Sequence, residues 1–209
     1  MKLRRLLCLV LLPLLLVACS GPNDFSVGEN GGFLDDRTGL TYHMLSPAFE
    51  AIAAGEEYGV LEDEDLPITF FEIPDEDAAK FLTDEDGYVY YAGDPDDLRP
   101  ADWTVSAALF CREEAISVVQ KTLTADADGE ALSLLLSLWF EGEGEEELPP
   151  GSAEKTLRVK LQSTEFPGIV YCFSFAKYAS GDAYCYELLS GRTVKLPAAL
   201  TVLIVGENG

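Results

Sequence analysis

The sequence predicts an α+β fold that is mainly antiparallel β-sheet, with hairpins and one or two short helices. Segments rich in β-branched and aromatic residues recur along the chain, which is typical of strands. Turns that contain Asp and Gly separate several of these segments. Residues 130–140, by contrast, have a helical composition. With 48% hydrophobic residues, the chain is that of a globular protein and not of a disordered stalk.

The first 19 residues have the pattern of an export signal. Basic residues at positions 2, 4 and 5 precede an apolar stretch, Leu6–Val17, which is too short to span a bilayer as a helix. The tetrapeptide Leu16-Val17-Ala18-Cys19 resembles the lipobox of bacterial lipoproteins. The resemblance implies a diacylglyceryl group on Cys19, cleavage of the signal peptide 1–18, and anchoring at the outer face of a bacterial membrane.

We expect three parts in the chain. Residues 1–18 are the signal peptide, and residues 19–32 are the lipidated Cys and a flexible tether rich in Gly, Asn and Ser. Residues 33–209 form a single globular domain, with an acidic N-terminal lobe (33–100) and a near-neutral, β-rich C-terminal lobe (101–209).

The charge distribution supports this division. Residues 50–100 hold 17 acidic and two basic residues, whereas residues 152–209 hold five acidic and six basic residues. The chain without its leader carries a net charge of −26, because the leader holds three of the 14 basic residues and no acidic one. Nucleic acids and anionic lipid headgroups both require a positive surface, so the sequence argues against them as partners.

Two segments of the acidic lobe share a hairpin pattern. Leu34–Tyr42 and Leu82–Tyr90 have Leu, Asp, Gly and Tyr at equal offsets, and Leu188–Val194 is a looser copy. A repeat architecture such as a propeller is one interpretation. The irregular spacing favours the other, in which separate hairpins use the same turn chemistry. Between the first two copies we expect short helices at 47–54 and 74–82 and a strand at 67–73.

The C-terminal lobe has a clearer order. We expect strands at 103–111 and 116–123, a helix at about 129–140, and a strand at 156–162 whose inward side chains are Leu157, Val159 and Leu161. Residues 130–140 also fit a strand by alternation, but their Leu, Ala and Ser content, without a β-branched residue, favours a helix. Closing strands are expected at 193–196 and 201–205.

The segment 169–187 predicts a hairpin. A two-residue loop at Ser180-Gly181 would place Phe175 opposite Tyr186. In that register Cys172 lies ~13 Å from the residue that faces Cys185, whereas a disulfide needs Cα atoms within ~7 Å. Cys111 makes the number of cysteines in the folded part odd. We therefore predict no disulfide.

The candidate site residues outside the anchor are acidic. If calcium binds, the residues to consider are Asp63, Asp65, Asp84 and Asp86, because calcium takes six to eight oxygen ligands. A charge run is more typical of a solvated face, so the sequence predicts no cofactor. His43 is the only histidine, and no nucleophile with a base is visible, so we predict no catalytic residue.

These observations favour a lipid-anchored, non-enzymatic binding or interaction module of the cell envelope. Its partners would be the membrane, through the lipid on Cys19, and an envelope protein or small ligand. One alternative is a small-ligand or calcium-binding lipoprotein that uses the acidic lobe. Another is a hydrolase that uses paired carboxylates. The interaction module predicts an exposed apolar patch rather than a pocket. Stabilisation by calcium would support the ligand-binding alternative, and a deep cleft with two buried carboxylates would support the hydrolase.

Overall fold

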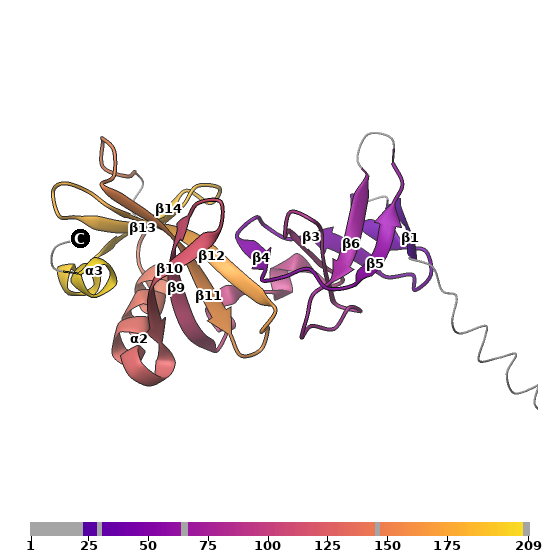
Figure 1. Ribbon diagram of the computed structural model, residues 1–209, viewed down its shortest axis with the longest axis horizontal. Coiled ribbons are helices and arrows are strands. Elements are labelled where there is room, and N and C mark those ends of the chain that lie inside the picture. Colours follow the sequence, from indigo (N-terminus) through magenta and orange to yellow (C-terminus); the bar gives the residue numbers. More distant parts are fainter. Residues whose placement is uncertain (1–22, 29–30, 64–66, 145–146, 207–209) are drawn as a thin grey trace, which may run out of the picture.

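The computed structural model of the protein describes residues 23–28, 31–63, 67–144 and 147–206. These residues form two β-sheets that lie next to each other along the long axis of the molecule (Figure 1). The signal peptide 1–18 and Cys19 lie outside the described residues. Antiparallel sheets with few helices confirm the predicted α+β class at the coarse level. The closed barrel formed by the first sheet was not predicted.

Seven strands close the barrel in the order β1-β2-β3-β8-β7-β6-β5. They are β1 (Asn23–Val27), β2 (Phe33–Asp35), β3 (Thr41–Met44), β5 (Glu57–Leu61), β6 (Ile68–Glu72), β7 (Phe81–Thr83) and β8 (Val89–Tyr91). The β1–β5 pair that closes the barrel is parallel, and the other pairs are antiparallel. Closure leaves no open sheet edge along this path.

The interior of the barrel is filled by aromatic rings. Phe25 and Phe70 have ring centroids 4.3 Å apart, and Tyr90 meets Phe70 edge to face at 5.1 Å. Phe25 belongs to β1, which begins at Asn23, ten residues before Phe33, where the globular domain was predicted to begin. That prediction was wrong for residues 23–28 because β1 is held between β2 and β5.

The two predicted hairpins are confirmed as β2–β3 and β7–β8. Gly39 and Gly87 adopt φ values of 75° and 84°, which glycine tolerates at no steric cost. The two hairpins are neighbours in one barrel because β3 pairs with β8. The shared pattern therefore reflects reuse of turn chemistry, and the two copies are not propeller blades.

The direction of the strands places three turns at one end of the barrel. β1 and β5 are parallel, and β7 runs the same way because it lies two antiparallel steps from β5. The turns after β1, β5 and β7 therefore share an end, which we call the distal end. β3 also runs this way and ends there at Met44. Asn23, where β1 begins, lies at the opposite end.

The second sheet has the strand order β10-β9-β11-β12-β13-β14, and β4 adds to β12. Its strands are β4 (Phe49–Ala51), β9 (Val105–Glu113), β10 (Ser117–Thr124), β11 (Lys155–Ser163), β12 (Ile169–Lys177), β13 (Ala183–Glu187) and β14 (Arg192–Leu196). Two short 3-10 helices, η1 (Pro95–Asp97) and η2 (Pro100–Asp102), precede β9. The strands predicted near β9, β10, β11 and β14 are confirmed.

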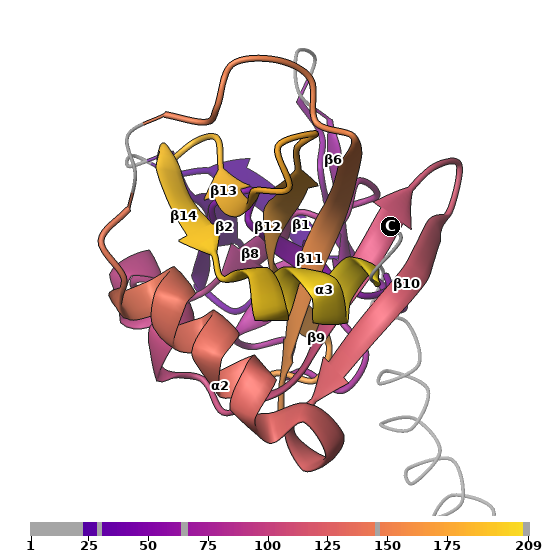
Figure 2. The same ribbon diagram turned by 90° about the vertical axis from the view of Figure 1, so that its left-hand side faces the viewer.

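Two helices cover one face of this sheet, α2 (Ala125–Glu141) and α3 (Ala198–Val205), as Figure 2 shows. The helix predicted over residues 130–140 is confirmed within α2. Thr124 caps it by accepting a hydrogen bond from the backbone of Ala127, and Leu135 and Trp139 face the core. The Trp139 ring stacks on Phe173 of β12 at 4.2 Å.

Three predicted elements have a different secondary structure. Residues 47–54 contain strand β4 because Phe49–Ala51 pairs with β12, a contact distant in sequence. Residues 74–82 form consecutive turns and the start of β7, because Asp75 has φ of 68°, which interrupts a right-handed helix. Residues 201–205 belong to helix α3, which buries Leu200 and Ile204 against the sheet.

The hairpin predicted at 169–187 exists as β12–β13, but its register differs by one residue. Phe175 lies opposite Cys185, not Tyr186. The loop has five residues, 178–182, because Tyr178 donates its backbone N–H to Asp182 and Gly181 takes a φ of 89°. Cys111, Cys172 and Cys185 are buried free thiols.

The barrel and the second sheet share an apolar cluster. Its buried members come from both halves: Leu45, Phe49, Ile73, Phe81, Val89, Leu98 and Ile169. Trp103, which precedes β9, packs edge to face on Phe49 at 5.9 Å. The two halves are therefore joined by side-chain packing as well as by the chain. Among the described residues, no helix is long and apolar enough to cross a membrane.

Candidate functional site

A hollow of about 830 Å³ opens at the distal end of the barrel. Strands β2, β3, β5, β6 and β8 and the β7–β8 turn supply its walls. The lining residues are Gly31, Phe33, Met44, Val60, Leu61, Glu62, Pro67, Ile68, Thr69, Asp84, Glu85, Asp86, Tyr88 and Tyr90. The hollow therefore depends on residues that are up to 59 positions apart in the sequence.

The hollow has a buried apolar base and exposed apolar walls. Phe33, Leu61 and Tyr90 are buried in the barrel core. Met44 and Tyr88 are 51% and 39% exposed, and both line the hollow, where apolar side chains that lie together in a groove can mark a contact site. A ligand in the hollow would cover both side chains.

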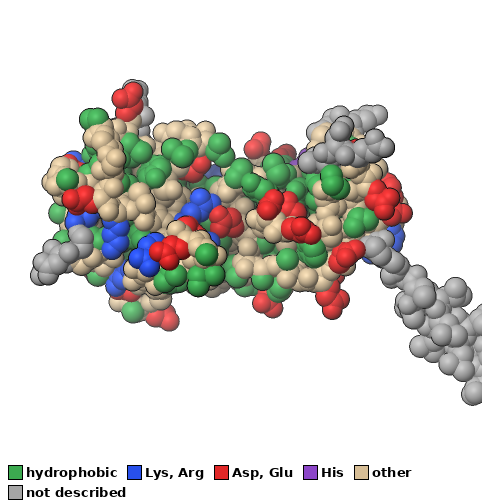
Figure 3. Space-filling view, turned by 45° about the horizontal axis from the view of Figure 1, so that its top comes forward, with side chains coloured by type: hydrophobic (Ala, Val, Ile, Leu, Met, Phe, Trp, Pro, Cys, Tyr) green, Lys and Arg blue, Asp and Glu red, His purple; other side chains and the backbone are tan. Residues whose placement is uncertain are grey.

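Acidic residues stand at the margin of the hollow. Glu62, Glu85 and Asp86 are exposed, Asp84 is partly buried, and no Lys, Arg or His is among the lining residues that the structure describes. Figure 3 shows acidic side chains on both halves of the visible face, whereas most Lys and Arg side chains lie on the half of the second sheet. The hollow therefore opens into a region of negative potential.

The side chain of Asp84 organises the β7–β8 turn. One of its oxygens accepts the backbone N–H groups of Asp86 and Tyr88, each at 3.0 Å, and the other accepts the hydroxyl of Tyr90 at 2.7 Å. Burial raises the pKa of Tyr90, and the Asp84 carboxylate raises it further. Tyr90 is therefore a neutral donor that fixes the acidic turn to the barrel core.

The structure brings only part of the predicted calcium set together. Asp84 and Asp86 both line the hollow, whereas Asp63 follows Glu62 and is not among the lining residues. Asp65 lies outside the described residues. Among the residues that the structure describes, no group of three or more His, Cys, Asp or Glu side chains could hold a metal ion.

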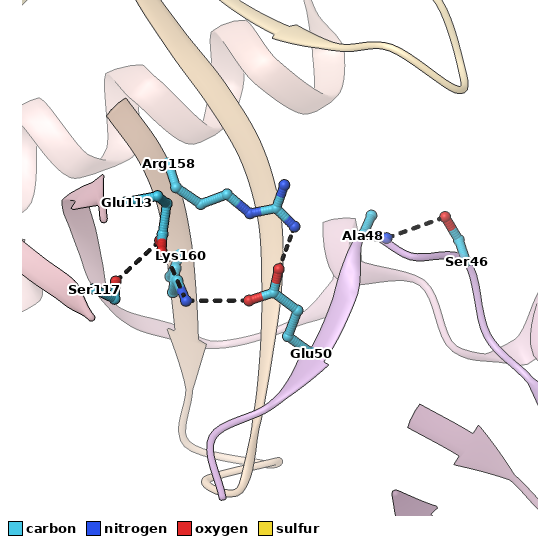
Figure 4. Close-up of polar contacts among 7 residues, drawn as sticks. All are labelled: Ser46, Ala48, Glu50, Glu113, Ser117, Arg158 and Lys160. Atoms are coloured by element: carbon cyan, nitrogen blue, oxygen red, sulfur yellow. Dashed lines mark hydrogen bonds and ion pairs between the residues drawn. The ribbon is translucent and has the colours of Figure 1, made fainter. Parts of the chain in front are cut away.

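A second polar cluster joins β4 to the second sheet (Figure 4). Glu50 pairs with Arg158 and, at 3.1 Å, with Lys160, and Lys160 lies 3.5 Å from Glu113. Leu157 and Val159 face the helix-covered core, so Arg158 and Lys160, which alternate with them, project from the opposite face. Burial would raise the pKa of Glu50, but the two cations hold it below its usual value.

This cluster covers a cysteine. Cys172 lies opposite Lys160 in the sheet register and is buried. Burial raises the pKa of its thiol, and the nearby Glu50 carboxylate raises it as well, so the thiol stays protonated. The contacts of Glu50 therefore hold strands together, and they do not activate a nucleophile.

Sequence reasoning identified the acids of the hollow but missed its apolar walls. Met44, Val60 and Ile68 are ordinary strand residues in the sequence, and only closure of the barrel brings them to one end. The Glu50–Arg158 pair spans 108 positions and has no local sequence signal.

The chain was compared with known proteins, and no family model, no curated protein and no solved structure matches it.

Proposed function

We propose that the protein is a lipoprotein, anchored by lipid on Cys19 at the outer face of a bacterial membrane, and that it binds a small ligand in the hollow without transforming it. The observation that carries the proposal is the hollow itself. Its volume of about 830 Å³ falls in the range of ligand sites, which is ~300–1,000 Å³, and its walls are mainly apolar.

The direction of the barrel supports this proposal. Asn23, where β1 begins, is four residues after Cys19, and four residues span at most ~14 Å. The end of the barrel that holds Asn23 would therefore lie close to the lipid. The hollow lies at the distal end, where it would open away from the membrane and be accessible to ligands outside the cell.

The buried thiols favour binding over catalysis. Cys172 and Cys185 are buried, and burial raises the pKa of both thiols. Neither has the exposure or the thiolate character that a catalytic nucleophile needs. Asp84, the best-positioned carboxylate of the hollow, is engaged by three hydrogen bonds from its own turn and from Tyr90.

The anchor is tested by labelling cells with radioactive palmitate. Cys19→Ser is expected to abolish labelling, because the thioether can form only on that sulfur. Cys8→Ser is the matched control, since it removes the other leader cysteine, and it is expected to leave labelling unchanged. Equal labelling of the Cys19→Ser variant would refute the anchor.

The hollow is tested with the neutral fluorescent dye Nile red and the chain from Ser20 onward, which contains every described strand and helix. Dye fluorescence is expected to rise on binding. Met44→Trp places a bulky ring on an exposed wall and is expected to weaken dye binding about tenfold or more. Val119→Trp is the control, because Val119 is equally exposed (50%) but lies on β10. An equal loss of dye affinity in both variants, or no loss in either, would show that the dye does not bind in the hollow.

A further inference from the structure

We infer that the hollow selects an organic cation, a small molecule in which an ammonium or guanidinium group adjoins an apolar body. This inference rests on the proposed function and adds the charge of the ligand to it. The juxtaposition that supports it is an apolar wall, an exposed aromatic ring and a margin whose described charged residues are all acidic.

The apolar wall accounts for the body of the ligand. Met44, Val60 and Ile68 come from three different strands and line the hollow together. Met44 is half exposed although it lies on a barrel strand, so a ligand can bury apolar surface there without displacing the core. The flexible thioether side chain of Met adapts to bound groups of irregular shape.

The margin accounts for the charge. Glu62, Glu85 and Asp86 are exposed, and none of the described lining residues is basic, so none of these neutralises the three carboxylates. The ring of Tyr88, 39% exposed, lies in the same lining between the acidic turn and β8. The face of an aromatic ring attracts an ammonium or guanidinium group, and nearby carboxylates add to that attraction.

A metal ion fits this site less well than an organic cation. Calcium requires six to eight oxygen ligands around one point. The oxygens of Asp84 already accept hydrogen bonds from Asp86, Tyr88 and Tyr90. An organic cation needs no such shell, because it gains from charge, an aromatic face and apolar contact together.

The test compares three octyl compounds below their micelle concentrations: octyltrimethylammonium, octyl glucoside and octyl sulfate. They share an apolar chain and differ in the charge of the head group. Calorimetric titration of the chain from Ser20 onward is expected to show that the cation binds about tenfold tighter than the glucoside, with the sulfate weakest. Added salt is expected to narrow the difference by screening.

A double variant identifies the charges responsible. Glu85→Gln with Asp86→Asn is expected to reduce the preference for the cation to about threefold or less, while the affinity for octyl glucoside stays unchanged. Asp126→Asn with Glu130→Gln removes the same charge from exposed positions on α2 and is the control, which is expected to retain the full preference. Melting temperatures of both variants verify that each is folded.

The outcomes separate this inference from the proposed function. Octyl glucoside and octyltrimethylammonium binding with equal affinity would overturn the choice of a cation and leave the ligand site standing. An equal loss of preference in the two double variants would attribute the effect to the net charge of the chain, and it would also overturn the inference. No binding of any octyl compound or of Nile red would overturn both the inference and the ligand site.

Discussion

The side chain of Asp35 is fully buried, yet it accepts five hydrogen bonds. Three come from the side chains of Asn23, Thr38 and Tyr58, at 2.7–2.9 Å, and two from the backbone N–H groups of Arg37 and Thr38. This carboxylate joins β1, the β2–β3 turn and β5 at the end of the barrel opposite the hollow. It therefore holds together the two strands whose parallel pairing closes the barrel.

Asp35→Asn is expected to lower the free energy of unfolding by about 2 kcal/mol, because one carboxylate oxygen becomes an N–H donor that faces other donors. Asp36→Asn is the control. Asp36 is exposed and accepts one hydrogen bond from Ser26, so we expect a change within ~0.5 kcal/mol. Urea unfolding measures both values. Equal changes in the free energy of unfolding for the two substitutions would show that the hydrogen bonds to buried Asp35 stabilise the fold no more than the exposed one to Asp36.

The pH dependence of this effect has a defined sign. Burial would raise the pKa of Asp35, but the hydrogen bonds from Thr38 and Tyr58 lower it below the usual 3.8. A lowered folded-state pKa stabilises the protein above the unfolded-state pKa, and the effect is lost as pH falls through the folded-state value. The stability difference between the protein and Asp35→Asn is therefore expected to persist from pH 7 to about 4 and to shrink below it.

At the scale of elements, the sequence predicted correctly those hairpins, helices and strands whose conformation depends on residues close together in the chain. The β2–β3 and β7–β8 hairpins follow from Asp and Gly at turn positions, and α2 follows from a segment rich in Leu and Ala. Strand β11 follows from strict alternation, with Leu157 and Leu161 buried. Each of these patterns lies within about 17 consecutive residues.

The elements that sequence reasoning missed are decided by distant partners. β4 is a strand because it pairs with β12, which lies about 120 residues later in the sequence. α3 is a helix because its apolar face packs against the second sheet. The β12–β13 register was wrong by one residue because the length of its loop was misjudged.

The candidate site, like the fold, was predictable only in the parts that depend on residues close together in the sequence. Asp84 and Asp86 are evident as an acidic cluster in the sequence. Their neighbours in the hollow, Met44 and Val60, become visible only once the barrel closes through β1 and β5. No local pattern encodes a parallel pair between residues 23–25 and 59–61, so neither the hollow nor its contents could be derived from the sequence.

At the scale of the molecule, the barrel and the second sheet are held together by one strand and its surroundings. β4 leaves the barrel path between β3 and β5 and adds to β12 of the second sheet. Its Phe49 enters the shared apolar cluster, and its Glu50 reaches across β12 to Arg158 and Lys160 on β11 (Figure 4). We therefore expect the two halves to unfold in a single transition.

Glu50→Gln tests this coupling. It removes the carboxylate that pairs with the partly buried Arg158 and leaves Lys160 with Glu113 alone, so we expect it to lower the free energy of unfolding by about 1–3 kcal/mol. Because Glu50 has a lowered pKa in the folded state, its contribution is fully present above the unfolded-state pKa of about 4.5 and is lost as the pH falls through the lower folded-state pKa. The difference between the variant and the unchanged protein is therefore expected to shrink as the pH falls below about 4.5.

Glu114→Gln is the matched control for this substitution. Glu114 pairs with Arg112 at 2.9 Å, but both side chains are more than half exposed, and exposed pairs contribute less than ~1 kcal/mol. Urea unfolding is followed by fluorescence of Trp103 and Trp139, on the sheet side, and by far-ultraviolet circular dichroism, which reports both halves. Coincident transitions that shift together in Glu50→Gln support coupling through β4. If the fluorescence transition of Glu50→Gln shifts to another urea concentration and its circular dichroism changes in two separate steps, the two halves unfold independently.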